Sequence, residues 1–532
     1  MAQTRAVVTE QRLASDAGPV ITGGRATTGT PGSAGRWASI PVATALLVLA
    51  WGLLSGNIFL DGDPYWHVAV GKWIVAHRAV PTTEFYSHTM PGIAWTAHEW
   101  LSEVIMNATV TLAGWRGLHV LISICYALTA GYMMRFLLDR IEPIYAMTVC
   151  AVCLATVNTH FLGRPHVLAW PLIALWVGTL VTAVEQDERP PWWLLLLVPI
   201  WTNLHASFTL AIGFAGALAL DAVWTQPDMA ARRVAARRWA PFMVACVLGV
   251  LINPRGVHAL THAAGVMNMT KTLDIVSEWR SADFHQFQFF LIWLLCVMAA
   301  AFVIRMRLSF PRVLFILGLV YLALKHQRYH SLAGLVSPFI LAAPLGAALR
   351  QMAHSHVSNA AGLDAFFLRR ARPAGWRGMA LAAVAACVLV PATWRLIPSE
   401  PSVRFSPNAA LQAFRATGVE GRVLNSYGLG GFLIAKGVPV YIDGRGDMYG
   451  DTFMEETSNA LGLTTPRALE TVLSKYKIGW TLISPGTPAI ELLDHLPTWQ
   501  RVFADTIAVV HVRRELLDAA KTTSTMGRTP AR

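Results

Sequence analysis

Charged residues are scarce in this chain, and their scarcity excludes most soluble folds. Only 14% of the 532 residues are Asp, Glu, Lys or Arg, whereas soluble domains average about 25%. Hydrophobic residues make up 54% of the chain, and apolar runs that approach the ~20 residues needed to cross a bilayer recur along it. The composition therefore predicts an α-helical multi-pass membrane protein.

Cysteine is also scarce, and none of it lies in a polar stretch. All six cysteines fall within apolar runs, so the polar regions carry no disulfide framework. Cys150 and Cys153 have the spacing of a metal or redox pair, but no other ligand lies nearby in the sequence. Small buried hydrophobic residues are the better interpretation of both.

A nucleic-acid site and a cleavable signal peptide are not evident either. The net charge is +12, but no basic patch with interleaved aromatic residues appears, so we expect no nucleic-acid partner. Residues 1–38 are rich in Gly, Thr, Ala and Arg and lack an apolar core. They are predicted to form a disordered cytoplasmic tail.

Eleven apolar runs are candidate membrane spans of a body that covers residues 39–398. Short spans are tolerated where backbone lines a protein cavity. Segments 64–78 and 98–113 are too short or too amphipathic to span, and we expect them on the membrane surface, within a first external loop at 57–116. The eleven runs are 39–56, 117–137, 143–160, 167–185, 191–203, 206–226, 239–253, 288–305, 312–325, 331–349 and 378–396.

Arginine distribution sets the expected orientation. If the N-terminal tail is cytoplasmic, alternation places every dense Arg cluster on the same side, as the positive-inside rule requires. The C-terminal domain then lies on the external face of the membrane. The cytoplasmic clusters are Arg135 and Arg140; Arg232, Arg233, Arg237 and Arg238; Arg305, Arg307 and Arg312; and Arg350, Arg369, Arg370, Arg372 and Arg377.

Composition changes near residue 400, which predicts a small external α/β domain at 399–515 and a disordered tail at 516–532. Alternation of strands with helices is typical of such a domain. Strands are expected at Arg422–Asn425, Val438–Ile442, Ile478–Ile483 and Ile507–Val512, and helices at 407–417, 451–461, 466–475 and 488–495.

Two turns of this domain contain glycine. Tyr427-Gly-Leu-Gly-Gly431 follows a strand and opens a helix, as a phosphate-binding loop does, but its spacing departs from the dinucleotide fingerprint. Nucleotide binding is therefore the less favoured interpretation. Asp443-Gly-Arg-Gly-Asp447 follows a strand, where Asp and Gly are ordinary turn residues.

The densest titratable chemistry lies in Asp61-Gly-Asp-Pro-Tyr-Trp-His67, just after the first apolar run. Asp63 precedes Pro64, and Pro is preferred at the first helical position, so Asp63 can be the N-cap of a surface helix. Asp61 has no such structural reason and is a loop carboxylate, a base or a cation ligand. His67 lies one turn along from Asp63 on the same helix face.

These residues also permit a metal without requiring one. Asp61, Asp63 and Glu99 offer the oxygen ligands that a divalent cation such as Mg²⁺ or Mn²⁺ prefers. His67 and His98 suit a softer metal better.

The predicted topology brings further polar residues of the helix ends to the external face, where ionisable residues are usually functional. Guanidinium groups match phosphate well, so phosphate binding is one interpretation of the cations and contact with lipid headgroups is the other. His166 and His205 are more often satisfied hydrogen-bonding residues than catalysts. The cations are Arg164, Arg255, Lys325 and Arg328, and Glu278 lies on the same face.

An Asp-x-Asp-type motif in the first external loop, a following surface helix and an external C-terminal domain resemble the GT-C superfamily of polyprenyl-phosphate-dependent membrane glycosyltransferases. Asp63-Pro-Tyr-Trp-His67 resembles the first-loop motif of oligosaccharyltransferase catalytic subunits. Tyr427-Gly428 matches the end of their Trp-Trp-Asp-Tyr-Gly motif, whose Trp-Trp-Asp is absent here. His98-Glu-Trp-Leu101 and Asn253-Pro-Arg-Gly256 resemble strings of a group of bacterial membrane proteins.

The resemblance implies transfer of a sugar from a polyprenyl-phosphate lipid to a glycan, lipid or protein acceptor at the external, periplasmic face of a bacterial inner (plasma) membrane. It gives the role of general base or divalent-cation ligand to Asp61 or Asp63, with Glu99 in support. External cations would stabilise the lipid phosphate, and we assign that role to Arg164, Arg255, Lys325 and Arg328. The expected acceptor-side residues are His67, His98, His205, Glu278, Tyr427, Asp443 and Arg445.

Two other functions stay open. A lipid or polysaccharide transporter or flippase would carry internal repeats and ionisable residues in the middle of its spans, and neither is evident here. A non-catalytic envelope assembly protein would use the C-terminal domain to bind a partner and would not depend on Asp61.

Overall fold

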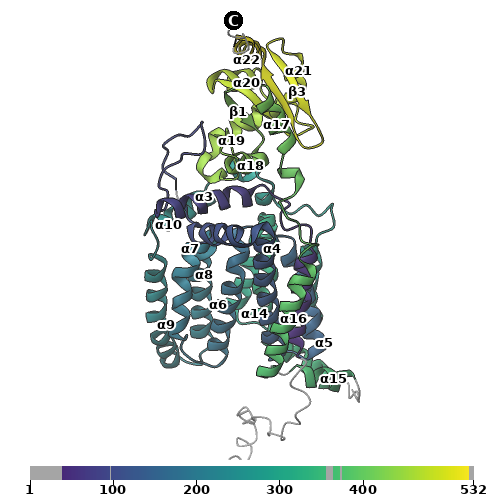
Figure 1. The fold of residues 1–532 in the computed structure, drawn as a ribbon. Helices are drawn as coiled ribbons and strands as arrows, with labels where there is room; N and C mark the ends of the chain where they lie inside the picture. The colour runs from purple at the N-terminus through teal and green to yellow at the C-terminus, as the bar shows by residue number, and fades with distance from the viewer. Residues whose placement is uncertain (1–38, 96, 355–362, 372–373, 527–532) are drawn as a thin grey trace, which may run out of the picture.

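The computed structural model describes residues 39–95, 97–354, 363–371 and 374–526. Figure 1 shows a bundle of upright helices with a smaller C-terminal domain beyond one end of it. Helix α3 (Asp63–His77) lies between the two parts and runs across the helix ends. The predicted N-terminal tail at 1–38 and the last residues, 527–532, lie outside the described residues.

Every one of the eleven predicted apolar runs is helical over most of its length. Among the residues that the structure describes, five helical segments are long and apolar enough to cross a membrane: Trp100–Leu138, Pro165–Glu185, Ala206–Trp224, Gln327–Met352 and Trp376–Thr393. Shorter apolar helices accompany them in the described part of the chain. The chain therefore has the helices of a multi-pass membrane protein, and the count of eleven spans stays a prediction.

The body contains these helices: α2 (Ile40–Leu54), α4 (Trp100–Leu138), α5 (Pro143–Asn158), α6 (Pro165–Glu185), α7 (Leu197–Leu204), α8 (Thr209–Trp224), α9 (Met229–Val250), α10 (His258–Met267), α11 (Lys271–Ile275), α12 (Phe289–Phe302), α13 (Phe310–Lys325), α14 (His330–His354), α15 (Leu363–Arg370) and α16 (Trp376–Thr393). Five short 3₁₀ turns connect or extend helices there or lead out of the body: η2 (Trp192–Leu196), η3 (Ala206–Phe208), η4 (Ser277–Trp279), η5 (Gln327–Tyr329) and η6 (Val403–Phe405).

Helix α4 contains both a surface segment and a span. Its backbone leaves helical geometry at Gly114, where φ is 64° and ψ is −168°. Glycine adopts positive φ without the steric cost that a Cβ imposes. The bend lets the first part of α4 lie across the helix ends beside α3 while the second part joins the upright bundle (Figure 1). Residues 64–78 and 98–113, which we expected on the membrane surface, are mostly helical and cross the ends of the upright helices, with α4 beginning at Trp100. Their position on a membrane surface stays a prediction.

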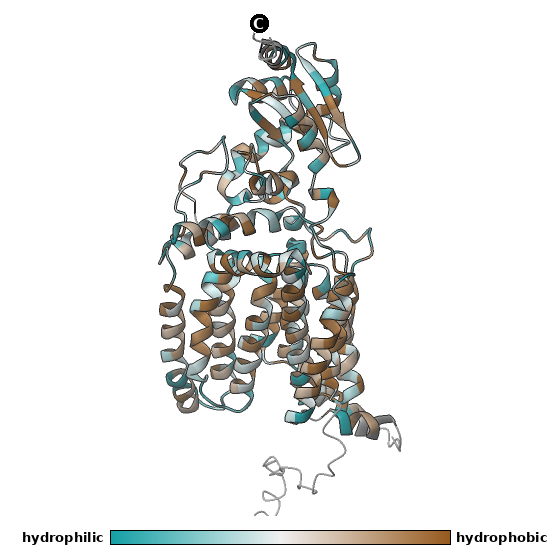
Figure 2. Ribbon diagram, in the orientation of Figure 1, coloured by the Kyte–Doolittle hydropathy of each residue, from teal (hydrophilic) through white to brown (hydrophobic). Residues whose placement is uncertain are grey.

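Figure 2 shows that the upright helices consist mostly of hydrophobic residues. Large hydrophobic side chains such as Leu47, Phe302 and Val388 are 62–75% exposed. Exposed apolar surface marks an interaction with membrane or protein, and here it lies both on the span-length helix α16 and on the shorter apolar helices α2 and α12. The bundle interior is filled by fully buried aromatic residues such as Trp176 and Trp293.

The C-terminal domain is a mixed four-stranded sheet with helices, as predicted in class. The strand order is β1-β2-β4-β3; β1 pairs with β2 in parallel, and the other two pairs are antiparallel. The strands are β1 (Arg422–Asn425), β2 (Ile478–Leu482), β3 (Trp499–Ala504) and β4 (Val509–Arg513); the helices are α17 (Asn408–Ala416), η7 (Tyr427–Leu429), α18 (Gly430–Ala435), α19 (Gly446–Gly462), α20 (Ala468–Lys475), α21 (Ala489–His495) and α22 (Arg514–Met526).

Two sequence predictions fail in this domain, and one strand was not predicted. The strand expected at Val438–Ile442 is absent from the described sheet, and only Val440 forms an isolated bridge, with Ser87 of the first loop. The side chain of Asn425 bonds the backbone of Tyr441 and Ile442, and so occupies groups that a neighbouring strand would otherwise pair. Strand β3 was not predicted. The tail expected at 516–532 is helical as far as Met526, because Leu517 and its neighbours pack against the sheet.

Candidate functional site

The start of α3 is held by Asp61. Its Oδ1 accepts a hydrogen bond from the backbone N–H of Asp63 at 3.2 Å. The N-cap position is Gly62, and Asp63 is the first residue of the helix. The prediction that Asp63 is the N-cap is therefore wrong by one residue, because the preceding turn places the carboxylate of Asp61 over the free N–H group. The Asp63 carboxylate is left available for other contacts.

Three carboxylates converge on one guanidinium. Arg164 lies directly before α6 and bonds Asp61 through Nε; its Nη2 lies 3.2 Å from Asp63 Oδ2 and its Nη1 lies 2.7 Å from Glu278 Oε1. We call these four residues the arginine-centred cluster. Their side chains are 11–22% exposed, so the cluster is largely buried but open to a ligand. It joins segments more than 200 residues apart in the sequence.

Charge in the arginine-centred cluster is unbalanced, since one cation faces three acids. Burial, together with the charges of Asp61 and Glu278, raises the pKa of Asp63 to about 8, although Arg164 opposes the shift. For Glu278, burial alone would raise the pKa, but Arg164 and Arg328 outweigh it and lower the pKa to about 2. The two carboxylates therefore differ in protonation: Glu278 is ionised at neutral pH, whereas Asp63 gains or loses its proton close to neutral pH. Such separated pKa values are typical of functional sites.

Arg328 is a second cation close to Glu278. It belongs to η5, and its guanidinium carbon lies 4.1 Å from the centre of the Trp279 ring. Among the described residues it forms no ion pair within 4 Å. Its positive charge is therefore still available to an anionic ligand, in contrast to Arg164.

A second polar group lies beside the first and is centred on Glu99. Its carboxylate lies 3.3 Å from His205 Nε2 and 3.8 Å from both His67 Nε2 and His98 Nε2. The other ring nitrogen of His67, Nδ1, lies 3.4 Å from Glu103 Oε1. Burial and the nearby Asp447 carboxylate raise the pKa of Glu99 to about 8. We call these five residues the histidine cluster.

The remaining predicted cations have different surroundings. Arg255 Nη2 donates to the backbone carbonyls of Trp95 and, at 3.3 Å, of Thr82, so Arg255 holds the first external loop. Lys325 ends α13 and is exposed. Neither lies among the ion pairs of the arginine-centred cluster, and their assignment to the donor phosphate stays a prediction.

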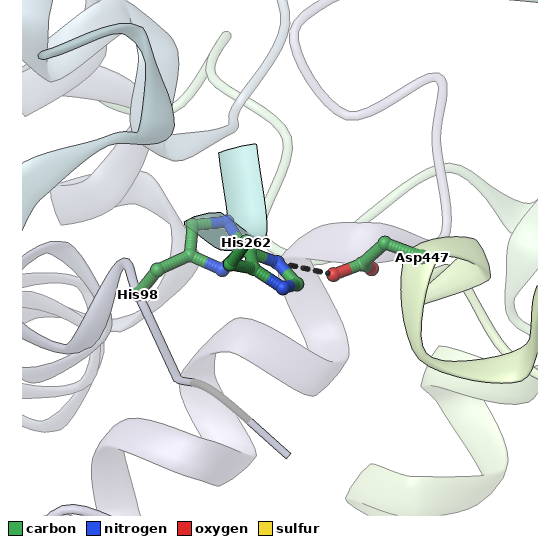
Figure 3. A group of neighbouring side chains, drawn as sticks. All are labelled: His98, His262 and Asp447. Atoms are coloured by element: carbon green, nitrogen blue, oxygen red, sulfur yellow. Dashed lines mark ion pairs between the residues drawn. The ribbon is translucent and has the colours of Figure 1, made fainter. Parts of the chain in front are cut away.

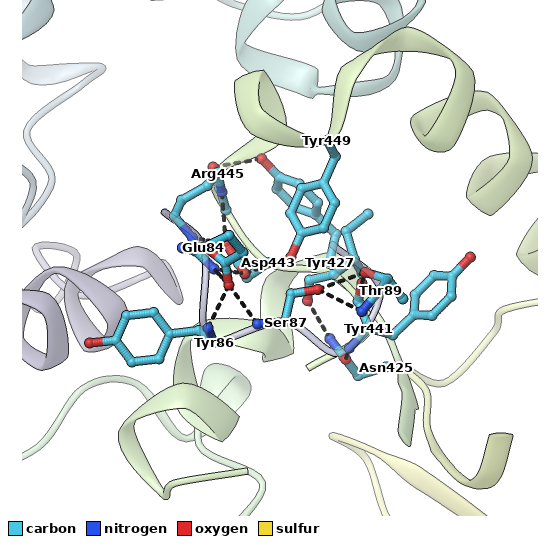
Figure 4. Close-up of polar contacts among 12 residues, drawn as sticks. Glu84, Tyr86, Ser87, Thr89, Asn425, Tyr427, Tyr441, Asp443, Arg445 and Tyr449 are labelled. Carbon is cyan, nitrogen blue, oxygen red and sulfur yellow. Dashed lines mark hydrogen bonds and ion pairs between the residues drawn. The ribbon is translucent and has the colours of Figure 1, made fainter. Parts of the chain in front are cut away.

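Asp443 and Arg445 form a buried ion-pair network with Glu84 of the first external loop (Figure 4). Arg445 donates to both carboxylates, and the Tyr449 hydroxyl donates to Asp443 Oδ2 at 2.8 Å. The three charged residues are at most 2% exposed. This network joins the first loop to the C-terminal domain. The predicted acceptor-side role of Asp443 and Arg445 stays a prediction.

The glycine-containing turn packs against the start of α3. A Cβ on Gly431 would lie 2.2 Å from the carbonyl oxygen of Gly62, and one on Gly62 would lie 2.1 Å from that of Gly428. Tyr427 donates from its hydroxyl to the carbonyl of Gly444 at 2.9 Å. Close backbone approach therefore explains these glycines without nucleotide binding, and it brings Tyr427 near the arginine-centred cluster.

The oxygen ligands of the arginine-centred cluster are of the type that Mg²⁺ or Mn²⁺ prefers. However, the guanidinium of Arg164 lies among them. A cation held by Asp61 and Asp63 would therefore take the place of some of these ion pairs, and it stays a prediction.

Three residues near the site were not identified as candidates from the sequence: Glu103, His262 and Asp447. Glu103 lies in a helix, and its distance from His67 along the sequence matches no known site motif. His262 and Asp447 are 185 residues apart in the sequence and meet only through the fold. The only available signal was local: Asp447 belongs to the Asp443–Asp447 turn.

No family model matches the sequence, and no curated protein matches it. Solved structures do. An oligosaccharyltransferase from Archaeoglobus fulgidus has a TM-score of 0.48 at 11% identity, over 83% of this chain and 69% of that chain. The arabinofuranosyltransferase AftD from Mycobacteria has a TM-score of 0.47 at 13% identity, over 89% of this chain and 39% of that chain.

ArnT from Cupriavidus metallidurans, bound to undecaprenyl phosphate, has a TM-score of 0.42 at 13% identity and covers 90% of this chain and 98% of its own. All three belong to the class of membrane glycosyltransferases to which the sequence resemblance pointed. At TM-scores below 0.5 and identities of 11–13%, these likenesses carry no argument about the activity or the substrate of this chain, which have to be inferred from its own residues.

Proposed function

We propose that this chain is a glycosyltransferase that moves a sugar from a polyprenyl-phosphate-linked donor to an acceptor at the external membrane face. The observation that carries the proposal is the arginine-centred cluster. It places a carboxylate that exchanges its proton near neutral pH, Asp63, at the ends of membrane-length helices and beneath a C-terminal domain.

Each part of the transfer has a group that suits it. An acceptor hydroxyl needs a base, and a base works best when its pKa lies near the working pH. The departing lipid phosphate needs positive charge, and Arg328 offers a guanidinium that no described carboxylate pairs. Helices α3 and α4 lie across the helix ends, where a lipid tail can remain in the bilayer while its headgroup reaches the cluster.

The orientation follows from charge. The Arg-rich first part of α9 and helix α15 lie at the end of the bundle opposite the C-terminal domain (Figure 1). The positive-inside rule would place that end in the cytoplasm. The cluster and the C-terminal domain would then face the outside, where Glu99 supports the base and Tyr427 faces the acceptor.

The test uses purified full-length protein in lipid nanodiscs with a mixture of polyprenyl-phosphate-linked sugars, radiolabelled in the sugar. Wild type should move label out of the lipid phase, and Asp61→Asn and Asp63→Asn should not. Asp187→Asn is the matched control, because Asp187 is an exposed acid with a positive φ that Asn also tolerates. EDTA decides whether a divalent cation is needed. Equal label release from wild type and Asp63→Asn would refute the proposal.

A further inference from the structure

Three metal-ligating side chains meet where the first external loop, the membrane body and the C-terminal domain come together (Figure 3). His98 precedes α4, His262 lies on α10, and Asp447 lies in the first turn of α19. One donor atom from each lies within 4.8 Å of the other two. We call these residues the three-ligand cluster. None of them belongs to the arginine-centred cluster.

Two donor atoms of this cluster face each other. His262 Nε2 and Asp447 Oδ2 form an ion pair at 3.0 Å (Figure 3), and neither atom has a further hydrogen-bond partner among the described residues. The imidazole and the carboxylate therefore converge without being held by other groups, as two ligands of one ion do.

We propose that His98, His262 and Asp447 bind a transition-metal ion of the zinc type, and that this ion fastens the C-terminal domain to the membrane body. Two imidazoles and one carboxylate suit Zn²⁺ or Co²⁺ better than Mg²⁺ or Ca²⁺, which prefer oxygen ligands. With bonds of about 2.0–2.2 Å, tetrahedral donors lie about 3.3–3.6 Å apart. The three donor atoms lie within 4.8 Å of one another, so the widest pair has to approach by at most about 1.5 Å.

The surroundings favour such a site. The three side chains are 20–26% exposed, which gives an ion a path from solvent. Glu99 Oε1 lies 3.8 Å from His98 Nε2, where an outer carboxylate can orient a ligating imidazole. Three protein ligands leave one coordination position for water or another ligand. Because the ligands come from three separate parts of the chain, the ion would add a link between the membrane body and the C-terminal domain beside the Glu84–Arg445–Asp443 network.

The experiment measures metal directly and does not depend on transferase activity. Full-length protein in nanodiscs is stripped with EDTA, dialysed and loaded with Zn²⁺ or Co²⁺. Bound metal is counted by mass spectrometry, and Co²⁺ is followed by its visible absorption, which reports imidazole ligation and low coordination number. Wild type should bind one equivalent and gain thermal stability on loading.

His262→Gln and Asp447→Asn should each lose at least tenfold in affinity for Zn²⁺ and the Co²⁺ absorption. His258→Gln is the matched control, because His258 is an exposed histidine on the same helix, and it should behave as wild type. Two ligand variants guard against one that does not fold. Folded wild type without bound metal, or both variants binding as wild type does, would overturn the proposal. Loss of the metal in Asp61→Asn instead would assign it to the arginine-centred cluster and overturn it equally.

Discussion

At the scale of single residues, Asp63 connects the geometry of the site to a measurable rate. Its pKa is raised to about 8 by burial and by the neighbouring acids. If Asp63 is the base, only its ionised form is active, so the wild-type transfer rate should rise with pH and level off above about 8. Asp63→Asn should lower the rate by about 10²–10⁴-fold, the usual contribution of a general base. A pH–rate profile of label release checks both.

The same shift predicts that Asp63→Asn stays folded. The folded-state pKa of Asp63 lies above the ordinary value of 3.8, so the ionised carboxylate is less favourable in the folded chain than in the unfolded one. Its cost to stability is absent below about pH 4 and grows as pH rises toward 8. Asn resembles the protonated acid, so at pH 8.5 the variant should melt at or above the wild-type temperature. Melting well below wild type would contradict the assignment of the pKa shift.

Arg445 allows a second test at this scale. Replacing Arg445 with Met leaves Glu84 and Asp443 buried without their cation, and loss of one partner from a buried pair costs about 3–5 kcal/mol. Arg501→Met is the control, because Arg501 is 44% exposed in its pair with Asp494 and exposed pairs contribute about 0–1 kcal/mol. Thermal unfolding in detergent should separate the two variants clearly. Equal melting temperatures would show that the buried network does not stabilise the fold.

The sequence alone identified most of the ionisable residues of the site, but it did not show which residues they contact. Asp61, Asp63, Arg164 and Glu278 were singled out because ionisable groups at the ends of apolar runs are expensive. That Arg164 contacts three acids could not be predicted, because the contacts join segments 101 to 114 residues apart. For Arg445 the local pattern suggested only turn chemistry, since Glu84 comes from a loop 361 residues away.

At the scale of elements, the turn at Gly444 touches the start of α3. A Cβ at Gly444 would lie 1.9 Å from Asp63 Oδ1 and 2.9 Å from Trp66 Nε1. Gly444→Ala therefore has to displace the turn or the carboxylate, and we expect it to lower the transfer rate at least tenfold while most of the fold survives. Gly265→Ala, with nothing within 4 Å of the added Cβ, is the control and should keep its activity. A Gly444→Ala variant with wild-type rate would mean that this contact does not position Asp63.

Element prediction from the sequence succeeded where periodicity was local and failed where tertiary contacts decided. All eleven apolar runs and strands β1, β2 and β4 were found, because each has the length and pattern of its class. The strand expected at Val438–Ile442 had the right residues, but the side chain of Asn425 and the first loop satisfy its backbone. Strand β3 was missed because its burial follows no simple alternation.

At the scale of the whole molecule, the C-terminal domain is attached to the body by contacts that no local pattern shows. Besides the Glu84–Arg445–Asp443 network, helix α19 reaches α11 of the body through Asp451. Its carboxylate accepts four hydrogen bonds, from the backbone N–H and the hydroxyl of both Thr270 and Thr272, at 2.8–3.2 Å. Asp451 thus satisfies the free N–H groups at the start of α11 from another part of the chain.

Replacing Asp451 with Ala should loosen this junction. Hydrogen exchange of residues 268–276 should become at least tenfold faster, while exchange in the sheet of the C-terminal domain should be unchanged.

Burial acts to raise the pKa of Asp451, but the Thr270 and Thr272 donors outweigh it and hold the pKa below its ordinary value of 3.8. The stabilisation is therefore fully present above about pH 4 and is lost as pH falls below that value.

Glu455→Ala is the matched control for Asp451→Ala, since Glu455 lies on the same helix and pairs with Lys271 of α11 at the surface, both about half exposed. That exposed pair should contribute little. Equal exchange in the two variants would mean that the C-terminal domain is held by its other contacts and not by the carboxylate that caps α11.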